Sequence, residues 1–224
     1  MRKSLRTYKK RKKTGKAYAF IDASNLFYGG EKSLGWKIDY KKLLKYLKTK
    51  YFVSKVFYFG GIETHGYNHD YLRDESVPIR IVERKLLYYL HNKGNQFNEA
   101  QLLLLSKHLQ RIRFYLKLAQ FGYKLFLKPV KLYYQEDGST QRKANCDVEM
   151  AFYLMKEKDN FDSVVVLSGD GDFLPVLKYL KKSGKEVIIL ARGSRTAREI
   201  RQFAGSNFRD FVRLEKEIKF IKKK

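Results

Sequence analysis

The sequence predicts an α/β fold with a central, mostly parallel sheet and helices on both faces. Short apolar runs alternate along the chain with longer amphipathic segments, most regularly in the last third. The run SVVVLSGD at 163–170 opens with an unbroken apolar stretch, which is typical of a parallel strand buried on both faces. The alternation of such strands with helices indicates that helices cover the sheet on both sides.

The first elements are read from apolar runs and helical spacing. Residues 17–22 (AYAFID) are expected to form a buried strand that ends in an acid. A helix is expected over 39–50, because its leucines fall on one face and its lysines on the other. A second strand is expected over 52–59, and a pair of glycines closes it.

The middle of the chain is less regular. Residues 61–98 are polar with scattered aromatics, and a short helix is expected near 82–91. A long helix should follow over about 98–121, where leucines recur every three or four residues. Residues 123–134 are strand-like, and Pro129 predicts a bend or an edge strand there.

The last third alternates clearly between helices and strands. After a turn at 135–140, the expected elements are a helix over 146–157, a strand over 163–170, a helix over 172–182, a strand over 185–191, a helix over 194–203, an edge strand over 208–214 and a terminal Lys-rich helix.

The predicted organisation is one domain with basic extensions. Residues 1–16 hold nine Lys and Arg and no acid, so they are expected to form a disordered arm. The domain is expected over 17–214, with a partly helical insertion at about 61–121. Residues 215–224 form a basic tail, and no linker divides the domain.

Composition points to a globular protein that binds a polyanion. The 224 residues include 48 Lys and Arg against 23 Asp and Glu, a formal net charge of +25. Hydrophobic residues make up 44% and aromatics 15%, which is enough for a core and unlike a disordered chain. Such a charge attracts nucleic acid first and an anionic membrane surface second; a surface charged only for solubility is the alternative.

Several classes of protein are excluded. No apolar run approaches the ~20 residues that a transmembrane helix needs. The run AYAFI is too short for the core of a signal peptide. The single cysteine, Cys146, excludes an internal disulfide and a multi-cysteine zinc site. We therefore expect a cytoplasmic protein without a membrane partner.

Four acids are predicted to meet at one edge of the sheet. Asp22 ends the first strand, Asp170 ends the run at 163–170 with Asp172 two residues on, and Asp147 lies at the start of a helix. Ligands of open α/β sheets bind beyond the carboxyl ends of the strands, which is this edge. Clustered carboxylates repel one another unless a cation lies between them, and hard oxygen ligands suit Mg²⁺ or Mn²⁺.

Each acid also has a purely structural interpretation. Asp22 could serve as a turn residue, Asp172 as a helix N-cap and Asp147 as a first-turn acid favoured by the helix dipole. Singly the two interpretations are about equal, and together the metal-site interpretation is stronger.

Basic and aromatic residues near this edge are candidates for nucleic-acid contacts. The basic candidates are Arg142, Lys143, Arg192 and Arg195. A solvated basic surface explains them about equally well. The aromatic candidates for stacking on a base are Tyr28, Trp36 and Tyr67.

Three segments together carry a family resemblance: FIDASN (20–25), NCDVEM (145–150) and SGDGDFLPVLKYLKKSGKEVIIL (168–190). They resemble the NYN (LabA-like) branch of the PIN-like nucleases. The resemblance implies a Rossmann-like, PIN-type fold and metal-dependent cleavage of RNA. It implies catalytic and metal-binding roles for Asp22, Asp147, Asp170 and Asp172, and an orienting role for Asn25. Many relatives carry a further acid where this chain has Tyr153.

The sequence thus predicts a metal-dependent endoribonuclease that uses Mg²⁺ or Mn²⁺, with RNA as its partner and DNA as the alternative substrate. One alternative function is an RNA-binding or regulatory NYN protein with little or no cleavage activity. Another is a Toprim-type metal-dependent enzyme, because D-G-D at 170–172 resembles the D-x-D of that class. The oligomeric state stays open, a homodimer included.

Overall fold

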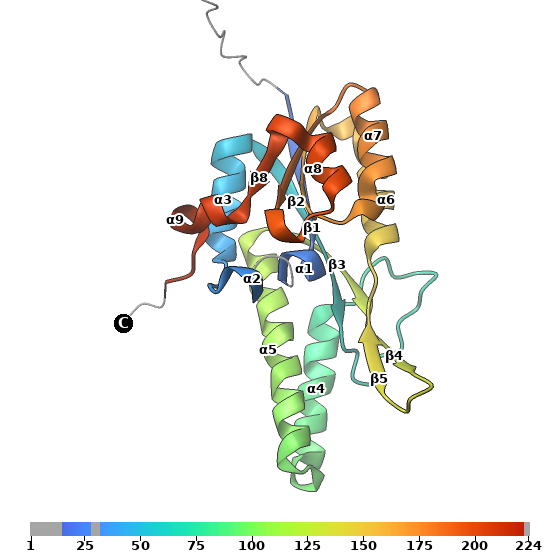
Figure 1. Ribbon diagram of the computed structural model, residues 1–224. Helices are drawn as coiled ribbons and strands as arrows, with labels where there is room; N and C mark the ends of the chain where they lie inside the picture. Colours follow the sequence, from blue (N-terminus) through green and yellow to red (C-terminus); the bar gives the residue numbers. More distant parts are fainter. Residues whose placement is uncertain (1–14, 28–31, 222–224) are drawn as a thin grey trace, which may run out of the picture.

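A central sheet of parallel strands organises the computed structural model, which describes residues 15–27 and 32–221 (Figure 1). Most of the expected arm (1–14), the stacking candidate Tyr28 and the last three residues lie outside these ranges. The strand order is β3-β2-β1-β6-β7-β8, and all neighbours pair in parallel. The strands are β1 Ala17–Asp22, β2 Val53–Ile62, β3 Lys124–Pro129, β6 Ser163–Leu167, β7 Glu186–Ala191 and β8 Phe208–Asp210.

Helices cover both faces of this sheet, which confirms the predicted α/β class. The helices are α1 Ala23–Asn25, α2 Lys32–Leu34, α3 Tyr40–Tyr51, α4 Ile79–Lys93, α5 Glu99–Phe121, α6 Asp147–Lys156, α7 Leu174–Lys182, α8 Arg198–Ala204 and α9 Glu215–Ile218. Apolar side chains of α3, α4, α5 and α9 form one core with the Ile21 face of β1. Those of α6, α7 and α8 form a second core with the Phe20 face.

The direction in which the strand order grows reverses between β1 and β6. From β1 the chain proceeds outward to β2 and β3 on one side, whereas β6, β7 and β8 build the other side. Ile21 lies opposite Leu167 across this boundary, so the two strands end almost level. In open α/β sheets such a switch point is where ligands bind.

Two hairpins project beyond the carboxyl edge of the sheet (Figure 1). One consists of α4 and α5, which pack against each other and point their connecting turn away from the sheet. The other is a separate two-stranded antiparallel sheet formed by β4 Lys131–Tyr134 and β5 Thr140–Lys143. Both hairpins therefore stand beside the edge at which the predicted acids lie.

Pro129 divides the strand-like segment predicted over 123–134. β3 ends at Pro129, and the next residue, Val130, donates its backbone N–H to the carbonyl of Ile62 before the chain enters β4. Proline cannot donate to a strand ladder, so the parallel sheet stops there. The predicted bend is present, and the residues after it belong to a different sheet.

Some predicted boundaries were wrong for local reasons. The edge strand expected over 208–214 ends at Asp210, whose carboxylate accepts the N–H of Val212 and so starts a 3-10 turn. The helix expected from Ser194 begins at Arg198, because Gly193–Arg195 form a 3-10 turn first. Within the described ranges, no helix combines the length and apolarity that crossing a bilayer requires.

Candidate active site at the carboxyl edge of the sheet

Asp22 is a buried acid, and both of its carboxylate oxygens accept hydrogen bonds. It is the last residue of β1 and is only 8% exposed. Its Oδ1 accepts from the backbone N–H and hydroxyl of Ser24, at 2.9 and 2.7 Å, and from the N–H of Asn25 at 3.1 Å. Its Oδ2 accepts from the Ser168 hydroxyl at 3.3 Å. These donors fix the carboxylate and satisfy a charge that burial would otherwise penalise.

The loops after β1 and β6 are joined by side chains. The Asn25 carbonyl oxygen accepts the Gly169 N–H at 3.0 Å. Ser168, 3% exposed, donates to Asp22 and accepts the N–H of Asp170 at 3.2 Å. Asn25 therefore joins the two loops, and the orienting role that the resemblance implied stays a prediction.

Asp170 and Asp172 follow β6 in a tight turn. The Oδ1 atom of Asp170 accepts the N–H of Asp172 at 3.0 Å and starts the 3-10 turn that leads into α7. Gly169 must be glycine here, because a Cβ atom would lie 2.6 Å from Thr196 Oγ1 and 2.9 Å from Thr196 Cα. The buried Thr196, in the loop after β7, thus packs closely against the turn that presents Asp170.

Asp147 reaches the same edge from the first turn of α6. Asn145 Oδ1 accepts its backbone N–H at 2.8 Å. Burial raises the pKa of the Asp147 carboxyl, and the charges of Asp22, Asp170 and Asp172 raise it further. The other three acids are thus close enough for their charges to act on Asp147.

The donor set suits a hard divalent cation, although it is not a closed cage. All four acids offer carboxylate oxygens, the ligands preferred by Mg²⁺ and Mn²⁺. Among residues 15–27 and 32–221, no three acidic, histidine or cysteine side chains already converge as the ligands of one ion. The arrangement fits a cation bound by one or two carboxylates, with water or phosphate as its other ligands.

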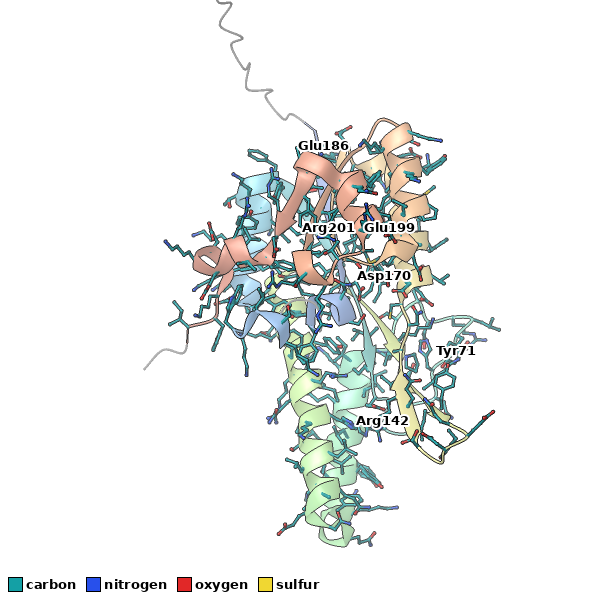
Figure 2. All side chains as sticks on the ribbon, in the orientation of Figure 1. Tyr71, Arg142, Asp170, Glu186, Glu199 and Arg201 are labelled. Carbon is teal, nitrogen blue, oxygen red and sulfur yellow. The ribbon has the colours of Figure 1, made fainter. Side chains whose placement is uncertain are left out.

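The predicted basic residues differ in their exposure and in whether they form ion pairs. Arg192 lies 3.2 Å from Asp210 in an ion pair, and its Nε is buried without a partner. Arg195 is exposed on the turn beside Thr196. Arg142, on β5, lies 3.1 Å from Glu63 in an ion pair and is 46% exposed (Figure 2). The backbone of Lys143 pairs with Lys131 in the same small sheet. Arg195 directly precedes Thr196, which packs against Gly169 in the turn that presents Asp170.

Tyr153 does not provide a fifth carboxylate at this edge. Tyr153 is 7% exposed, packs its ring 4.0 Å from that of Phe126, and donates its hydroxyl to Glu75 at 2.7 Å. Glu149, on the same helix, forms an ion pair with Lys128. Burial raises the pKa of the neighbouring Cys146 thiol to about 12, so a thiolate nucleophile is unfavourable here.

Two residues at the edge were missed by the sequence analysis. Ser168 joins Asp22 to Asp170, and its signal was its place directly after a buried strand. Glu199, on α8, is brought against Gly171 between the two acids of the turn, near Asp170 in Figure 2. Of the aromatic candidates, Trp36 and Tyr67 are both partly buried against the first core, and Tyr67 donates its hydroxyl to Asp74 at 2.8 Å. Stacking on a base stays a prediction for both.

Comparison with known proteins gives one family and distant relatives. The family model described as NYN domain matches residues 16–211. The Low amplitude and bright protein LabA of Synechococcus elongatus is 23% identical over 184 residues, which are 81% of this chain and 76% of that protein. A solved protein of unknown function from Vibrio parahaemolyticus is 18% identical with a TM-score of 0.56, and covers 92% of this chain and 96% of its own. That likeness supports the fold.

Proposed function

The chain belongs to the NYN domain family, and we propose that it is a metal-dependent endoribonuclease that hydrolyses RNA at the carboxyl edge of its sheet. One observation carries the proposal. Three segments bring acids to the carboxyl edge of the sheet: Asp22 ends β1, Asp170 and Asp172 follow β6, and Asp147 begins α6, where burial and the other three acids raise its pKa. A protein of net charge +25 has a concentrated negative site at the switch point of its sheet, which favours a cation that acts on a polyanion.

Asp22, Asp147, Asp170 and Asp172 would hold Mg²⁺ or Mn²⁺. When bound, such an ion polarises a phosphodiester and lowers the pKa of a bound water. Magnesium sites often use one or two carboxylates together with substrate phosphates, so an open set of acids is suited to binding the ion and the nucleic acid together. We therefore expect RNA to increase the affinity of the protein for the metal.

The surrounding residues would position these acids and the substrate. Ser24, Ser168 and Asn25 keep Asp22 and the turn at Asp170 fixed through hydrogen bonds. Arg195 would contact a backbone phosphate, while Arg192 holds the loop after β7 through Asp210. Contacts of this kind position a nucleic acid without reading its sequence.

The test is incubation of the purified protein with labelled single-stranded RNA and DNA in Mn²⁺, in Mg²⁺ or in EDTA. We expect RNA to be cleaved internally with metal and to stay intact with EDTA. Asp170→Asn should lose cleavage, because it removes a charge from the site while keeping the side-chain volume. Cleavage that survives EDTA or persists in Asp170→Asn would overturn the metal mechanism.

A matched control is Asp159→Asn. Asp159 is an exposed acid whose carboxylate lies 2.9 Å from Lys158, in the segment before β6 and therefore at the other end of that strand. Its replacement changes net charge by the same amount as Asp170→Asn and should leave cleavage unchanged. If both variants lose activity equally, overall charge rather than the site explains the result.

A second candidate function is RNA binding with little cleavage. It is favoured by Tyr153, which occupies a buried, hydrogen-bonded position where many relatives have an acid. Tight RNA binding without cleavage in any metal, retained in Asp170→Asn, would identify this function.

A further inference from the structure

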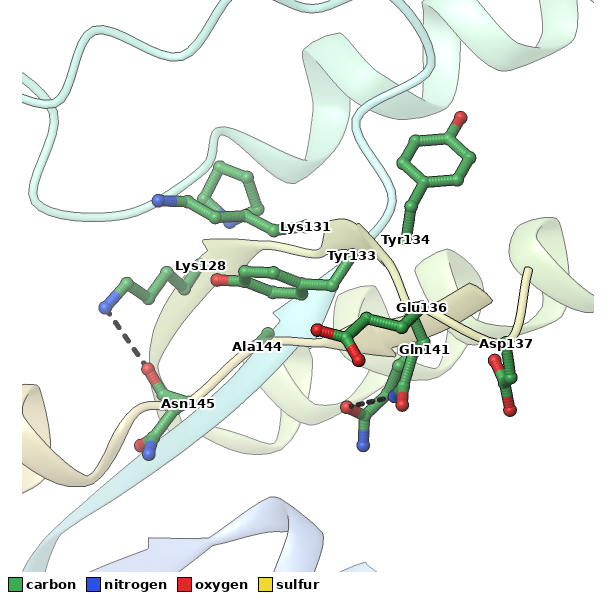
Figure 3. Close-up of a pocket in the computed structure, with 11 residues that line it drawn as sticks. Lys128, Lys131, Tyr133, Tyr134, Glu136, Asp137, Gln141, Ala144 and Asn145 are labelled. Carbon is green, nitrogen blue, oxygen red and sulfur yellow. Dashed lines mark hydrogen bonds between the residues drawn. The ribbon is translucent and has the colours of Figure 1, made fainter. Parts of the chain in front are cut away.

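A large open pocket lies between the β4–β5 hairpin and the end of β3 (Figure 3). Its cavity volume is about 820 Å³, within the range of about 300–1,000 Å³ usual for small-molecule sites. The lining residues that matter here are Lys128, Lys131, Tyr133, Glu136, Gln141 and Asn145. The pocket is thus built from residues that the sequence analysis assigned to no function.

Tyr133 presents an aromatic ring inside this pocket. It is 49% exposed, and Figure 3 shows its ring lying between the two lysines on one side and Glu136 with Gln141 on the other. Other aromatic rings of the molecule are also exposed, and Tyr133 is distinguished by lining this pocket beside two lysines. Aromatic rings beside basic side chains are how proteins stack the bases of single-stranded nucleic acids.

Charge is distributed unevenly along the pocket. Lys128 and Lys131 lie at the end that includes Asn145, whereas Glu136 and Asp137 lie toward the hairpin turn. Lys128 is shared with Glu149 and donates to the Asn145 carbonyl at 3.1 Å, while Lys131 Nζ lies 5.7 Å from the centre of the Tyr71 ring. A phosphate is therefore favoured at the lysine end and repelled at the turn, which orients a nucleotide along the pocket.

The lysine end of the pocket adjoins the candidate active site. Asn145 lines the pocket, and its side chain accepts the backbone N–H of Asp147. Asn145 thus belongs both to the pocket and to the candidate active site. A nucleotide whose phosphate sits at the lysine end would have its next phosphodiester near Asp147.

We propose that this pocket binds an unpaired base of a single-stranded nucleic acid, stacked on Tyr133, with its phosphate at Lys128 and Lys131. The inference rests on the proposed function for the identity of the ligand as a nucleic acid. The edge of the base meets Gln135 and Gln141, which bond to each other at 3.2 Å through one amide group each and retain a free oxygen and a free nitrogen. A duplex cannot enter, because its bases are stacked on each other and already paired.

The experiment measures binding in EDTA, so that cleavage plays no part. The probes are a fluorescent single-stranded RNA of ten nucleotides, the DNA of the same sequence and the blunt-ended RNA duplex of that sequence. Tyr133→Ala should weaken single-strand binding by roughly 5- to 100-fold, as expected for one lost stacked base, and leave duplex binding unchanged. Tyr133→Phe keeps the ring and should restore the affinity. Tyr88→Ala, which removes a 72% exposed tyrosine on α4, is the matched control and should have no effect.

Two outcomes overturn this inference, and a third separates it from the proposed function. Equal loss of single-strand and duplex binding in Tyr133→Ala, or no loss in either, overturns the pocket. Failure of Tyr133→Phe to restore binding also overturns it, since stacking needs only the ring. Cleavage absent in every metal, together with Tyr133-dependent binding of single strands, refutes the nuclease and keeps the pocket. As a direct check, RNA containing 4-thiouridine should form a photochemical crosslink to Tyr133 that mass spectrometry can locate.

Discussion

Asp22 and Asp147 face the same edge but are stabilised very differently. Asp22 accepts hydrogen bonds from Ser24, Asn25 and Ser168 and is part of the local structure. Burial and then the charges of its acidic neighbours hold the pKa of Asp147 above the usual range, although a hydrogen bond with Asn145 lowers that pKa. One acid therefore supports the fold, and the other costs stability in the absence of a cation.

Replacement of the two acids should shift stability in opposite directions. In EDTA at pH 7, Asp147→Asn should raise the melting temperature by about 1–3 °C, because it removes a repelled, partly buried charge. Asp22→Ala should lower the free energy of unfolding by about 1–3 kcal/mol, because it strips a helix cap and leaves buried donors unpaired. Thermal unfolding followed by circular dichroism measures both. A fall in stability for Asp147→Asn would contradict the repulsion inferred at this site.

His65 should make the protein less stable in mild acid. Its ring lies 5.1 Å from that of His108, and burial together with the charge of His108 lowers the pKa of His65 to about 4. Glu63 opposes this shift, and Arg142 adds to it. Below pH 6.5 the unfolded chain binds a proton that the folded chain does not, so stability is lost progressively as the pH falls from 6.5 toward 4.

His65→Asn tests this dependence on pH. Asparagine tolerates the left-handed backbone at this position, where φ is 47°. The difference in melting temperature between pH 7 and pH 4.5 should be smaller in the variant than in the wild-type protein. An unchanged difference would show that other groups account for the acid sensitivity.

At the scale of elements, the turn between β6 and α7 depends on close packing against the loop after β7. Gly169→Ala places a methyl group 2.9 Å from the backbone of Thr196, which cannot move as easily as the end of a side chain. We expect a loss of about 1–3 kcal/mol in the free energy of unfolding and a larger loss of cleavage, since Asp170 is displaced. Gly94→Ala is the control, because nothing lies within 4 Å of its added Cβ atom.

The elements of the sheet could be predicted from sequence where burial alone decides them. The apolar run at 163–167 becomes β6, and the acid that ends β1 and those that follow β6 lie at one edge because parallel strands end together. Pairings between distant surface groups could not be predicted in this way. The ion pair of Arg192 with Asp210 and the hydrogen bond of Tyr153 to Glu75 depend on how loops fold back, and apolar periodicity carries no record of them. The catalytic and binding roles of the site residues remain predictions.

The two-stranded sheet of β4 and β5 also depends on a long-range pairing that the sequence does not predict. Residues 131–134 have the apolar and aromatic character of a strand, so they were predicted to continue the segment before them. Pro129 diverts the chain, and pairing with β5 then creates the pocket around Tyr133. A pocket formed by one proline and a long-range pairing leaves no periodic signal in the sequence.

At the scale of the whole molecule, removal of residues 1–14 should weaken RNA binding more than turnover. These residues hold eight Lys and Arg, and their loss should reduce both affinity and the dependence of affinity on salt concentration. The deletion should stop at Thr14. Lys16 donates its N–H to Asp162 at 2.9 Å and accepts the N–H of Asp162 at 2.8 Å, so a longer deletion would disturb the start of β1.

Binding measured by fluorescence anisotropy at several salt concentrations gives the slope, and cleavage at saturating RNA gives the turnover. An unchanged salt slope would mean that residues 1–14 do not touch the RNA. A control with all eight basic residues replaced by glutamine keeps the length of the segment and separates charge from chain length.

The reversal of strand order between β1 and β6 also affects when activity can arise during protein synthesis. Asp22 leaves the ribosome early, but β6, the second strand that pairs with β1, and the turn carrying Asp170 are made some 140 residues later. A nascent chain that has not reached this turn lacks two of its four acids and has β1 unpaired on one side. If the protein is a ribonuclease, it cannot cleave the message that encodes it until translation of its domain is nearly complete.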